Sequence, residues 1–250
     1  MSDREATRVA VDVVDGRVRL TDLVAGVYLR PRPLAHHGTL ARVALVGAYA
    51  TLLAGDDLRL EIAVGPGAQL ELVEPSGTIA YDARGGSARW SATVDVAAGG
   101  TLVWDAAPFV VAHGADVHRC TRAVLDEGAA MLLRETLVLG RESESTGGRL
   151  YSSLHATYRG RPLLVEDLDV RDPAHRGSPG ILGDNRVLAT AAILGARPDS
   201  SSSPHETPLA GPGSLARVLA PHAHLALAAL ADTWQRWHET LSQPDTANRG

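Results

Sequence analysis

The segment IAVGPGAQLEL, residues 62–72, joins two apolar strands through a turn that its Gly-Pro-Gly sequence imposes. Just upstream, LRLEIAV at residues 58–64 alternates apolar and charged side chains, which is the period of a half-buried strand. The same strand–turn–strand shape returns in VDVAAGGTLVW (94–104), in AVLDEGAAMLL (123–133) and, more faintly, in TYRGRPLL (157–164).

The turn glycines of these four segments recur at a nearly constant interval. Gly67, Gly99, Gly128 and Gly160 are separated by 32, 29 and 32 residues. Regular spacing of one supersecondary unit predicts a mainly β protein built as a β-helix-like stack of strand–turn–strand layers. An ordinary antiparallel sandwich with similar hairpins is the alternative that this pattern leaves open.

The C-terminal third changes character and predicts about two α-helices. One is expected to begin near Ser214, which follows Gly213 and has the side chain of a helix cap. We therefore expect a helical segment over about 213–241, within a single domain covering 1–242, and a disordered tail over 243–250. The helical spacing is carried by apolar residues three and four positions apart, at Leu227, Leu230, Trp234, Trp237 and Leu241.

Composition narrows the classes of function. The chain has 250 residues, a net charge of −5 and 4% aromatic residues, which does not favour binding to nucleic acid. A single cysteine, Cys120, rules out an internal disulfide and fits a reducing compartment. The charged start, MSDREATRVAV, does not resemble a leader, and no apolar run approaches a membrane span, so we expect a cytoplasmic protein.

His113, His118 and Cys120 are the nearest approach to a cluster of metal ligands. A turn between two strands would bring the two histidines together, and His118 shares a strand face with Cys120. This soft ligand set would suit zinc, nickel or copper and would allow a small metal-dependent β enzyme. The competing interpretation is a polar strand face with a small cysteine packed beside it.

Two carboxylates fall on apolar strand faces. Glu135 lies among Met131, Leu133, Leu137 and Leu139, and Glu166 shares a face with Leu164, Leu168 and Val170. A buried carboxylate is costly unless it is paired or hydrated, so each residue marks either a functional polar path or a structural ion pair. Arg134 and Arg141 are the nearest arginines in the sequence for such a pair.

Six segments in order resemble motifs of the urease accessory protein UreD (UreH) family. The match covers roughly residues 27–241, and the order and spacing of the motifs are more specific than any one of them. The segments are LAGDDLRLEI (53–62) with VGPGAQL (64–70), GTLVW (100–104), RETLVLGR (134–141), RGRPLLVE (159–166), RVLAT (186–190) and LAGPGSL (209–215).

The resemblance implies a scaffold rather than an enzyme. Proteins of this family bind the urease apoprotein and the accessory proteins UreF and UreG, and together they insert nickel into urease while UreG hydrolyses GTP. The implied fold is a β-helix-like stack with two helices, and the implied nickel path is an interior polar tunnel. Asp56, Glu135 and Glu166 fall on acidic positions of the family, which implies nickel in transit and no tightly bound cofactor.

The chain also departs from the family pattern, as a divergent actinobacterial-like member would. Pro108 and His113 stand where the family carries Glu and Asp, and Ala54 replaces the first glycine of its GGD motif. A protein-binding β stack outside urease biology is therefore a third reading of this sequence.

Overall fold

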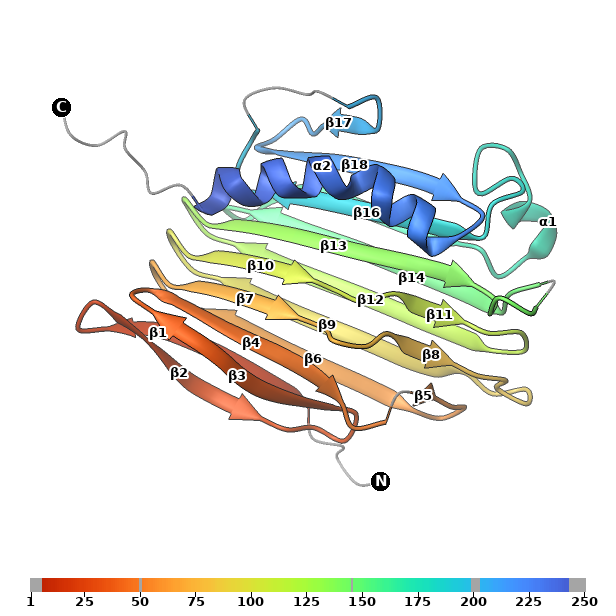
Figure 1. Ribbon diagram of the computed structural model, residues 1–250, viewed down its shortest axis with the longest axis horizontal. Helices are drawn as coiled ribbons and strands as arrows, with labels where there is room; N and C mark the ends of the chain where they lie inside the picture. Colours follow the sequence, from red (N-terminus) through yellow and green to blue (C-terminus); the bar gives the residue numbers. More distant parts are fainter. Residues whose placement is uncertain (1–5, 50, 145, 199–202, 243–250) are drawn as a thin grey trace.

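Two facing β-sheets form the body of the protein (Figure 1). The computed structural model describes residues 6–49, 51–144, 146–198 and 203–242. A seven-stranded sheet has the order β15-β14-β12-β9-β6-β1-β2. An eleven-stranded sheet has the main order β17-β18-β16-β13-β10-β7-β4-β3, and short strands β11, β8 and β5 pair beside it.

The elements alternate between the two sheets over the middle of the chain. The strands of the seven-stranded sheet are β1 (Thr7–Val14), β2 (Arg17–Val24), β6 (Asp57–Val64), β9 (Ala88–Val96), β12 (Asp116–Leu125), β14 (Arg149–Tyr158) and β15 (Arg161–Asp169). Those of the eleven-stranded sheet are β3 (Leu29–His37), β4 (Leu40–Gly47), β5 (Thr51–Leu52), β7 (Gln69–Val73), β8 (Thr78–Ala80), β10 (Thr101–Asp105), β11 (Phe109–Val111), β13 (Ala130–Leu139), β16 (Val187–Leu194), β17 (Glu206–Pro208) and β18 (Gly213–Ala220).

Three of the repeated glycines form the corners of the stack. Gly67, Gly99 and Gly128 each have a positive φ, between 65° and 70°, which glycine adopts without a steric penalty. Each corner takes the chain from a strand of one sheet to a strand of the other, and the strands of successive layers pair in parallel. Backbone N–H groups link the corners, since Gly67 donates to Ala98 O and Gly99 to Glu127 O, both at 3.1 Å. The predicted β-helix-like stack is therefore confirmed.

The fourth repeat differs from the other three. The turn at Arg159 and Gly160, with φ of 52° and 71°, joins β14 to β15 as an antiparallel hairpin within one sheet. The layered pattern therefore ends here, and the hairpin covers the last corner. The Tyr158 hydroxyl accepts a hydrogen bond of 3.2 Å from the N–H of Gly128, the last of the three corner glycines in the sequence.

We expect Tyr158→Phe to lower the free energy of unfolding by about 0.5–1 kcal/mol, because the Gly128 N–H loses its acceptor at an exposed site. Urea denaturation of the variant beside the wild type measures this change. Tyr49→Phe is the matched control, since Tyr49 is 63% exposed. Equal small shifts in the two variants would contradict a capping role for Tyr158.

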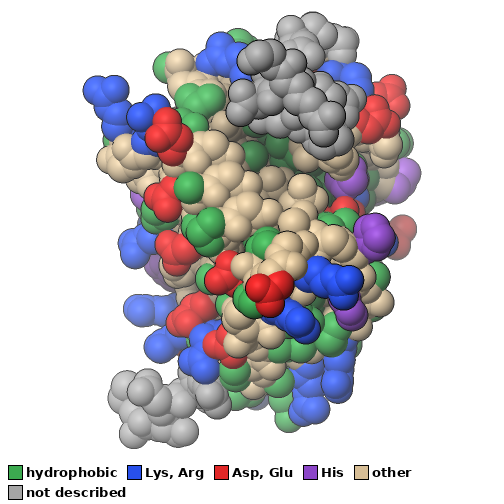
Figure 2. All heavy atoms as spheres, turned by 90° about the vertical axis from the view of Figure 1, so that its left-hand side faces the viewer, with side chains coloured by type: hydrophobic (Ala, Val, Ile, Leu, Met, Phe, Trp, Pro, Cys, Tyr) green, Lys and Arg blue, Asp and Glu red, His purple; other side chains and the backbone are tan. Residues whose placement is uncertain are grey.

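Figure 2 shows the end of the molecule where these corners lie. Backbone atoms and side chains other than hydrophobic, charged or histidine ones form a band through the middle of this face, and acidic and basic side chains are mixed along its sides.

The expected helix start near Ser214 is wrong. Residues 213–220 form β18, which pairs antiparallel with β16 from Gly213 to Ala220, so the strand satisfies its backbone groups in the sheet. The helix α2 (Ala223–Ser242) begins after it and lies on the outer face of the eleven-stranded sheet, against β13, β16 and β18 (Figure 1). The second helix, α1 (Pro173–Arg176), is a single turn whose N-cap Asp172 accepts from the N–H of Ala174.

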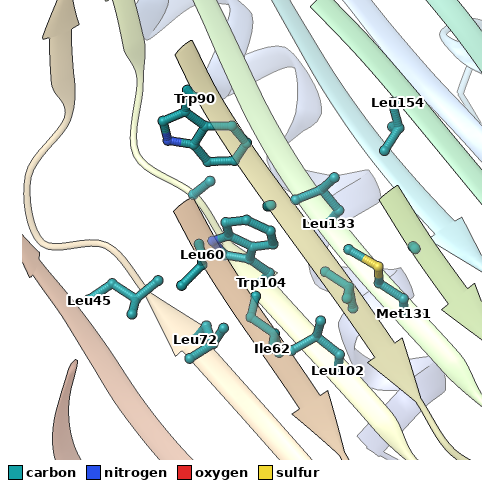
Figure 3. Close-up of a cluster of buried hydrophobic side chains, with 14 of the residues drawn as sticks. Leu45, Leu60, Ile62, Leu72, Trp90, Leu102, Trp104, Met131, Leu133 and Leu154 are labelled. Atoms are coloured by element: carbon teal, nitrogen blue, oxygen red, sulfur yellow. The ribbon is translucent and has the colours of Figure 1, made fainter. Parts of the chain in front are cut away.

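Two groups of buried side chains hold these layers together. Between the sheets, Trp90 and Trp104 stack with ring centroids 6.1 Å apart among leucine and isoleucine side chains (Figure 3). Beneath α2, Leu230 and Trp237 are fully buried against the eleven-stranded sheet, and Trp234 is partly buried. The tryptophans of α2 therefore contribute to packing.

The described part of the chain contains no helix that is long and apolar enough to cross a membrane. The predicted disordered tail, 243–250, lies outside the described residues.

Candidate functional site

Glu135 points between the two sheets and forms an ion pair there. It lies on β13 with 8% of its surface exposed, and its Oε2 accepts a hydrogen bond from Nη1 of Arg119. Arg119 lies on β12 in the opposite sheet and is 3% exposed. The pair therefore crosses the core, and Glu135 is an inward carboxylate with an arginine partner.

The partner is not one of the arginines nearest in the sequence. Arg134 pairs with Asp105 at 2.7 Å, and Arg141 pairs with Glu144 at 2.7 Å. Arg134 points away from Glu135 because neighbouring residues of a strand face opposite sides of the sheet. Arg141 lies beyond the end of β13.

Aromatic rings enclose the Arg119 guanidinium. Its Cζ lies 4.2 Å from the ring centroid of Trp90 and 5.8 Å from that of Phe109, both within the range of a cation–π interaction. Its Nε is buried and has no hydrogen-bond partner within the described ranges. Glu135 is therefore the only carboxylate for which a hydrogen bond to this guanidinium is seen among those residues.

Glu166 forms a second ion pair next to the first. It lies on β15, and its Oε2 accepts from Nη2 of Arg217 on β18. The contact therefore joins the strand of each sheet that comes last in the sequence. Burial raises the pKa of the Glu166 carboxyl, the positive charge of Arg217 opposes that shift, and the negative charge of Glu135 adds to it. The predicted carboxylates Glu135 and Glu166 are therefore close enough to interact.

Strand register explains why these residues meet. In the eleven-stranded sheet Glu135, Thr190 and Arg217 are aligned across β13, β16 and β18. In the seven-stranded sheet Thr121 and Glu166 are aligned with the buried Leu154 of β14 between them. The register therefore brings Glu135 and Arg217 into one row of their sheet, and Glu166 pairs with Arg217 from the other sheet.

Glu74 is a third interior carboxylate, and it follows the end of β7. One carboxylate oxygen accepts from Nε1 of Trp104 at 2.9 Å, and the other accepts from the N–H of Ala107 at 3.3 Å. Loss of hydration raises the pKa of Glu74 to about 7, although these hydrogen bonds and the charge of Arg119 oppose the shift. The positive charge of Arg119 thus acts on both Glu74 and Glu135.

These residues define a charge cluster between the sheets. It contains three carboxylates and two guanidinium groups. Arg119 and Glu135 are buried, whereas the side chains of Glu166 and Arg217 are 26% and 38% exposed. Its members are Glu74, Arg119, Glu135, Glu166 and Arg217.

Asp56 has a local role in the structure. It lies in the turn before β6, where its Oδ2 accepts from the N–H of Leu53 at 2.8 Å. Its own carbonyl accepts from the N–H of Arg89. These contacts stabilise the turn that leads into β6. Glu135 and Glu166, by contrast, form ion pairs with arginine side chains.

His113, His118 and Cys120 are placed outside the core. His113 follows β11, where its Nδ1 lies 2.8 Å from Thr146 Oγ1. His118 and Cys120 share a face of β12, as predicted, but it is the face opposite to Arg119, and the His118 ring lies 5.9 Å from the ring of Tyr151. Among the described residues, these three and all other His, Cys, Asp and Glu side chains form no group of three that could hold a metal ion.

Sequence reasoning missed three members of the cluster. Arg119 occupies an inward position of β12, between Val117 and Thr121, so an arginine on an apolar strand face was the available signal. Arg217 was hidden by the expected helix near 214. Glu74 follows the end of β7, and nothing in the local pattern distinguishes it from a turn residue.

The fold and this site together define a class: a β-solenoid-like stack of strands with a helix on the outer face of one sheet and ion pairs between the two sheets. The sequence model of the UreD urease accessory protein family matches residues 5–249. The chain therefore belongs to the UreD family of urease accessory proteins.

Individual relatives agree with this assignment. Urease accessory protein UreD 1 of Streptomyces griseus is 52% identical over 235 residues, which cover 92% of each chain. Urease accessory protein UreD of Streptomyces avermitilis is 36% identical over 75% of this chain and 79% of its own. That of Frankia alni is 37% identical over 83% of this chain and 78% of its own.

Proposed function

We propose that this protein is a maturation scaffold that takes part in nickel insertion into the urease active site, in a complex with UreF and UreG. Membership of the UreD family is the observation that carries this proposal. The work would be done in the cytoplasm, by holding the urease apoprotein and its partners rather than by catalysis. Nickel would be cargo, without a permanent site.

The charge cluster between the sheets is the proposed route for that cargo. Interior carboxylates are costly in an apolar core, and this protein keeps three of them together between its sheets. Carboxylate oxygens are hard ligands that exchange readily, which suits an ion in passage better than thiolates do. Glu135 and Glu166 would carry this role, whereas Asp56 would act through the conformation of its turn.

Co-purification tests the partners directly. The protein, expressed with the urease subunits, UreF and UreG of its own genome, should copurify with all of them in a defined ratio. Separate expression of each partner then shows which one binds the chain itself. Failure to retain any of them, with each partner present and folded, would contradict the scaffold role.

We expect Glu135→Gln and Glu166→Gln to reduce urease activation at least tenfold, because each removes a charged oxygen ligand from the route. An amide keeps the shape and can still accept from Arg119 or Arg217. Urease activity per amount of urease protein, measured in cells producing each variant, tests this expectation. Glu142→Gln is the control, since Glu142 is exposed.

Unfolding curves of the same variants separate function from structure. A loss of activation that matches a loss of folded protein would show that the two carboxylates are structural only.

A further inference from the structure

The outer face of the eleven-stranded sheet is covered by a helix over only part of its width. α2 packs on β13, β16 and β18, and among the described elements no helix lies over β7, β4 or β3 (Figure 1). Apolar side chains that alternate with those of the core still point to this face, at Ala44 and Val46 of β4, Val73 of β7 and Val103 of β10. These four side chains form an uncovered strip, in which the apolar surface beneath α2 continues beyond the helix.

A hollow lies in this strip between α2 and β4. The sheet contributes Val73 and Val103 to its lining, and α2 contributes Trp234 and His238. Arg42 of β4 lines it on the side away from α2. Its volume of about 160 Å³ is close to the ~150 Å³ of a cavity that holds a benzene ring. The hollow therefore has room for one large apolar side chain.

The uncovered strip has the width of a helix. Neighbouring strands lie about 4.8 Å apart, so the three steps from β10 through β7 and β4 to β3 span about 14 Å. An α-helix with its side chains is about 10–12 Å across. One helix therefore fits beside α2 on this face, and two do not.

The edge of the sheet at β3 does not favour the addition of a strand. β3 is the outermost strand, and it contains Pro31 and Pro33. Prolines in an edge strand leave the position of the missing N–H toward solvent, which protects the edge from pairing with another chain. A partner therefore meets this part of the sheet through its outer face.

Basic side chains border the uncovered strip on the side of β3. Arg30 and Arg32 are exposed, and the strand register places them on the outer face beside β4. Neither guanidinium forms an ion pair or a hydrogen bond within the described part of the chain. Both arginines are therefore available to carboxylates of another molecule.

The carboxylates of the strip are already paired. Glu71 lies 3.4 Å from Nε of Arg42 through Oε2, and 3.5 Å from Nε2 of His238 through Oε1. Asp105 pairs with Arg134 at 2.7 Å. The free charge that borders the strip is therefore positive.

We propose that the uncovered strip docks an amphipathic helix of a protein partner, which lays an apolar stripe on Val73 and Val103 and places acidic side chains beside Arg30 and Arg32. This inference rests on the proposed scaffold function and adds the surface and the chemistry of one partner. Apolar residues three and four positions apart on that helix would reach the strip, as those of α2 reach the strands next to it.

Charge reversal tests this surface with the purified urease subunits, UreF and UreG. Arg30→Glu/Arg32→Glu should weaken the affinity for one of these partners at least tenfold, and more at low than at high salt, because two attractive charges become repulsive. Arg89→Glu/Arg122→Glu is the matched control, since both arginines are exposed on the outer face of the other sheet. It should leave the affinity for that partner unchanged. Equal affinities of the two double variants would overturn the proposal.

A photo-crosslinking side chain at position 46 identifies the occupant. Val46 is 38% exposed in the strip, so p-benzoylphenylalanine placed there should crosslink to the same partner. Mass spectrometry should then locate the crosslink in a helix with an apolar stripe and acidic residues. No crosslink, or a crosslink to a basic segment, an extended segment or a second copy of this chain, would overturn the proposal.

The docking surface and the proposed function fail in different ways. A chain that binds an acidic helix through the strip but does not support nickel loading of urease would contradict the proposed function alone. A chain that supports nickel loading, while its strip neither crosslinks nor responds to charge reversal, would contradict the docking surface alone.

Discussion

Arg119→Met will lower the free energy of unfolding by about 3–5 kcal/mol, the range expected when one partner of a buried ion pair is removed. The substitution leaves Glu135 buried on β13 without its partner, and it also removes the cation from the face of Trp90. Glu74 loses the same neighbouring charge, so its pKa will rise further. Chemical denaturation at neutral pH, with an unchanged slope against denaturant, measures the effect.

A double-mutant cycle shows whether the loss comes from the pair. Replacing both partners, in Arg119→Met/Glu135→Leu, removes both buried charges and should recover most of the stability. Arg42→Met is the surface control, because Arg42 is 52% exposed in its pair with Glu71 at 3.4 Å and surface pairs contribute about 0–1 kcal/mol. Additive losses in the double variant would show that the two charges do not interact.

Glu74→Gln will remove a dependence of stability on pH. The wild-type carboxyl has a pKa of about 7 when folded, against 4.5 for an unperturbed glutamate. Below pH 4.5 both states hold the proton and the stability is complete. Between pH 4.5 and 7 only the unfolded chain releases the proton, so stability falls as pH rises and is lowest above pH 7.

The size of that fall is about 3 kcal/mol, since each pH unit across the interval contributes up to about 1.4 kcal/mol. Urea denaturation of the wild type and Glu74→Gln at pH 4.5 and pH 8 gives the two differences in stability. The variant should gain on the wild type by this amount as pH rises. Parallel pH profiles would contradict a buried, ionisable Glu74.

The layered fold could be predicted because one local feature repeats. A glycine with positive φ is needed at each corner, so Gly67, Gly99 and Gly128 mark the layers in the sequence itself. The turn at Gly160 has the same local chemistry but makes a hairpin, because a short glycine turn does not specify which sheet receives the next strand.

Only two carboxylates of the interior site could be predicted from the sequence. Strand parity identified Glu135 and Glu166 as inward carboxylates, since that information is local to each strand. Their partners Arg119 and Arg217 come from the opposite sheet, and which layers face each other depends on packing across the core. Residues 213–220 were expected to be helical because a capping serine is a local signal, whereas pairing with β16 is not.

Nickel in urease is the most direct measure of the central claim. Urease should be purified from cells that lack this chain, from cells that contain it, and from cells that carry Glu135→Gln, and its nickel content should be measured by elemental analysis. The account predicts urease protein in all three, with nickel only where the wild-type chain is present and little with the variant. Full nickel content in urease from cells without the chain would contradict it.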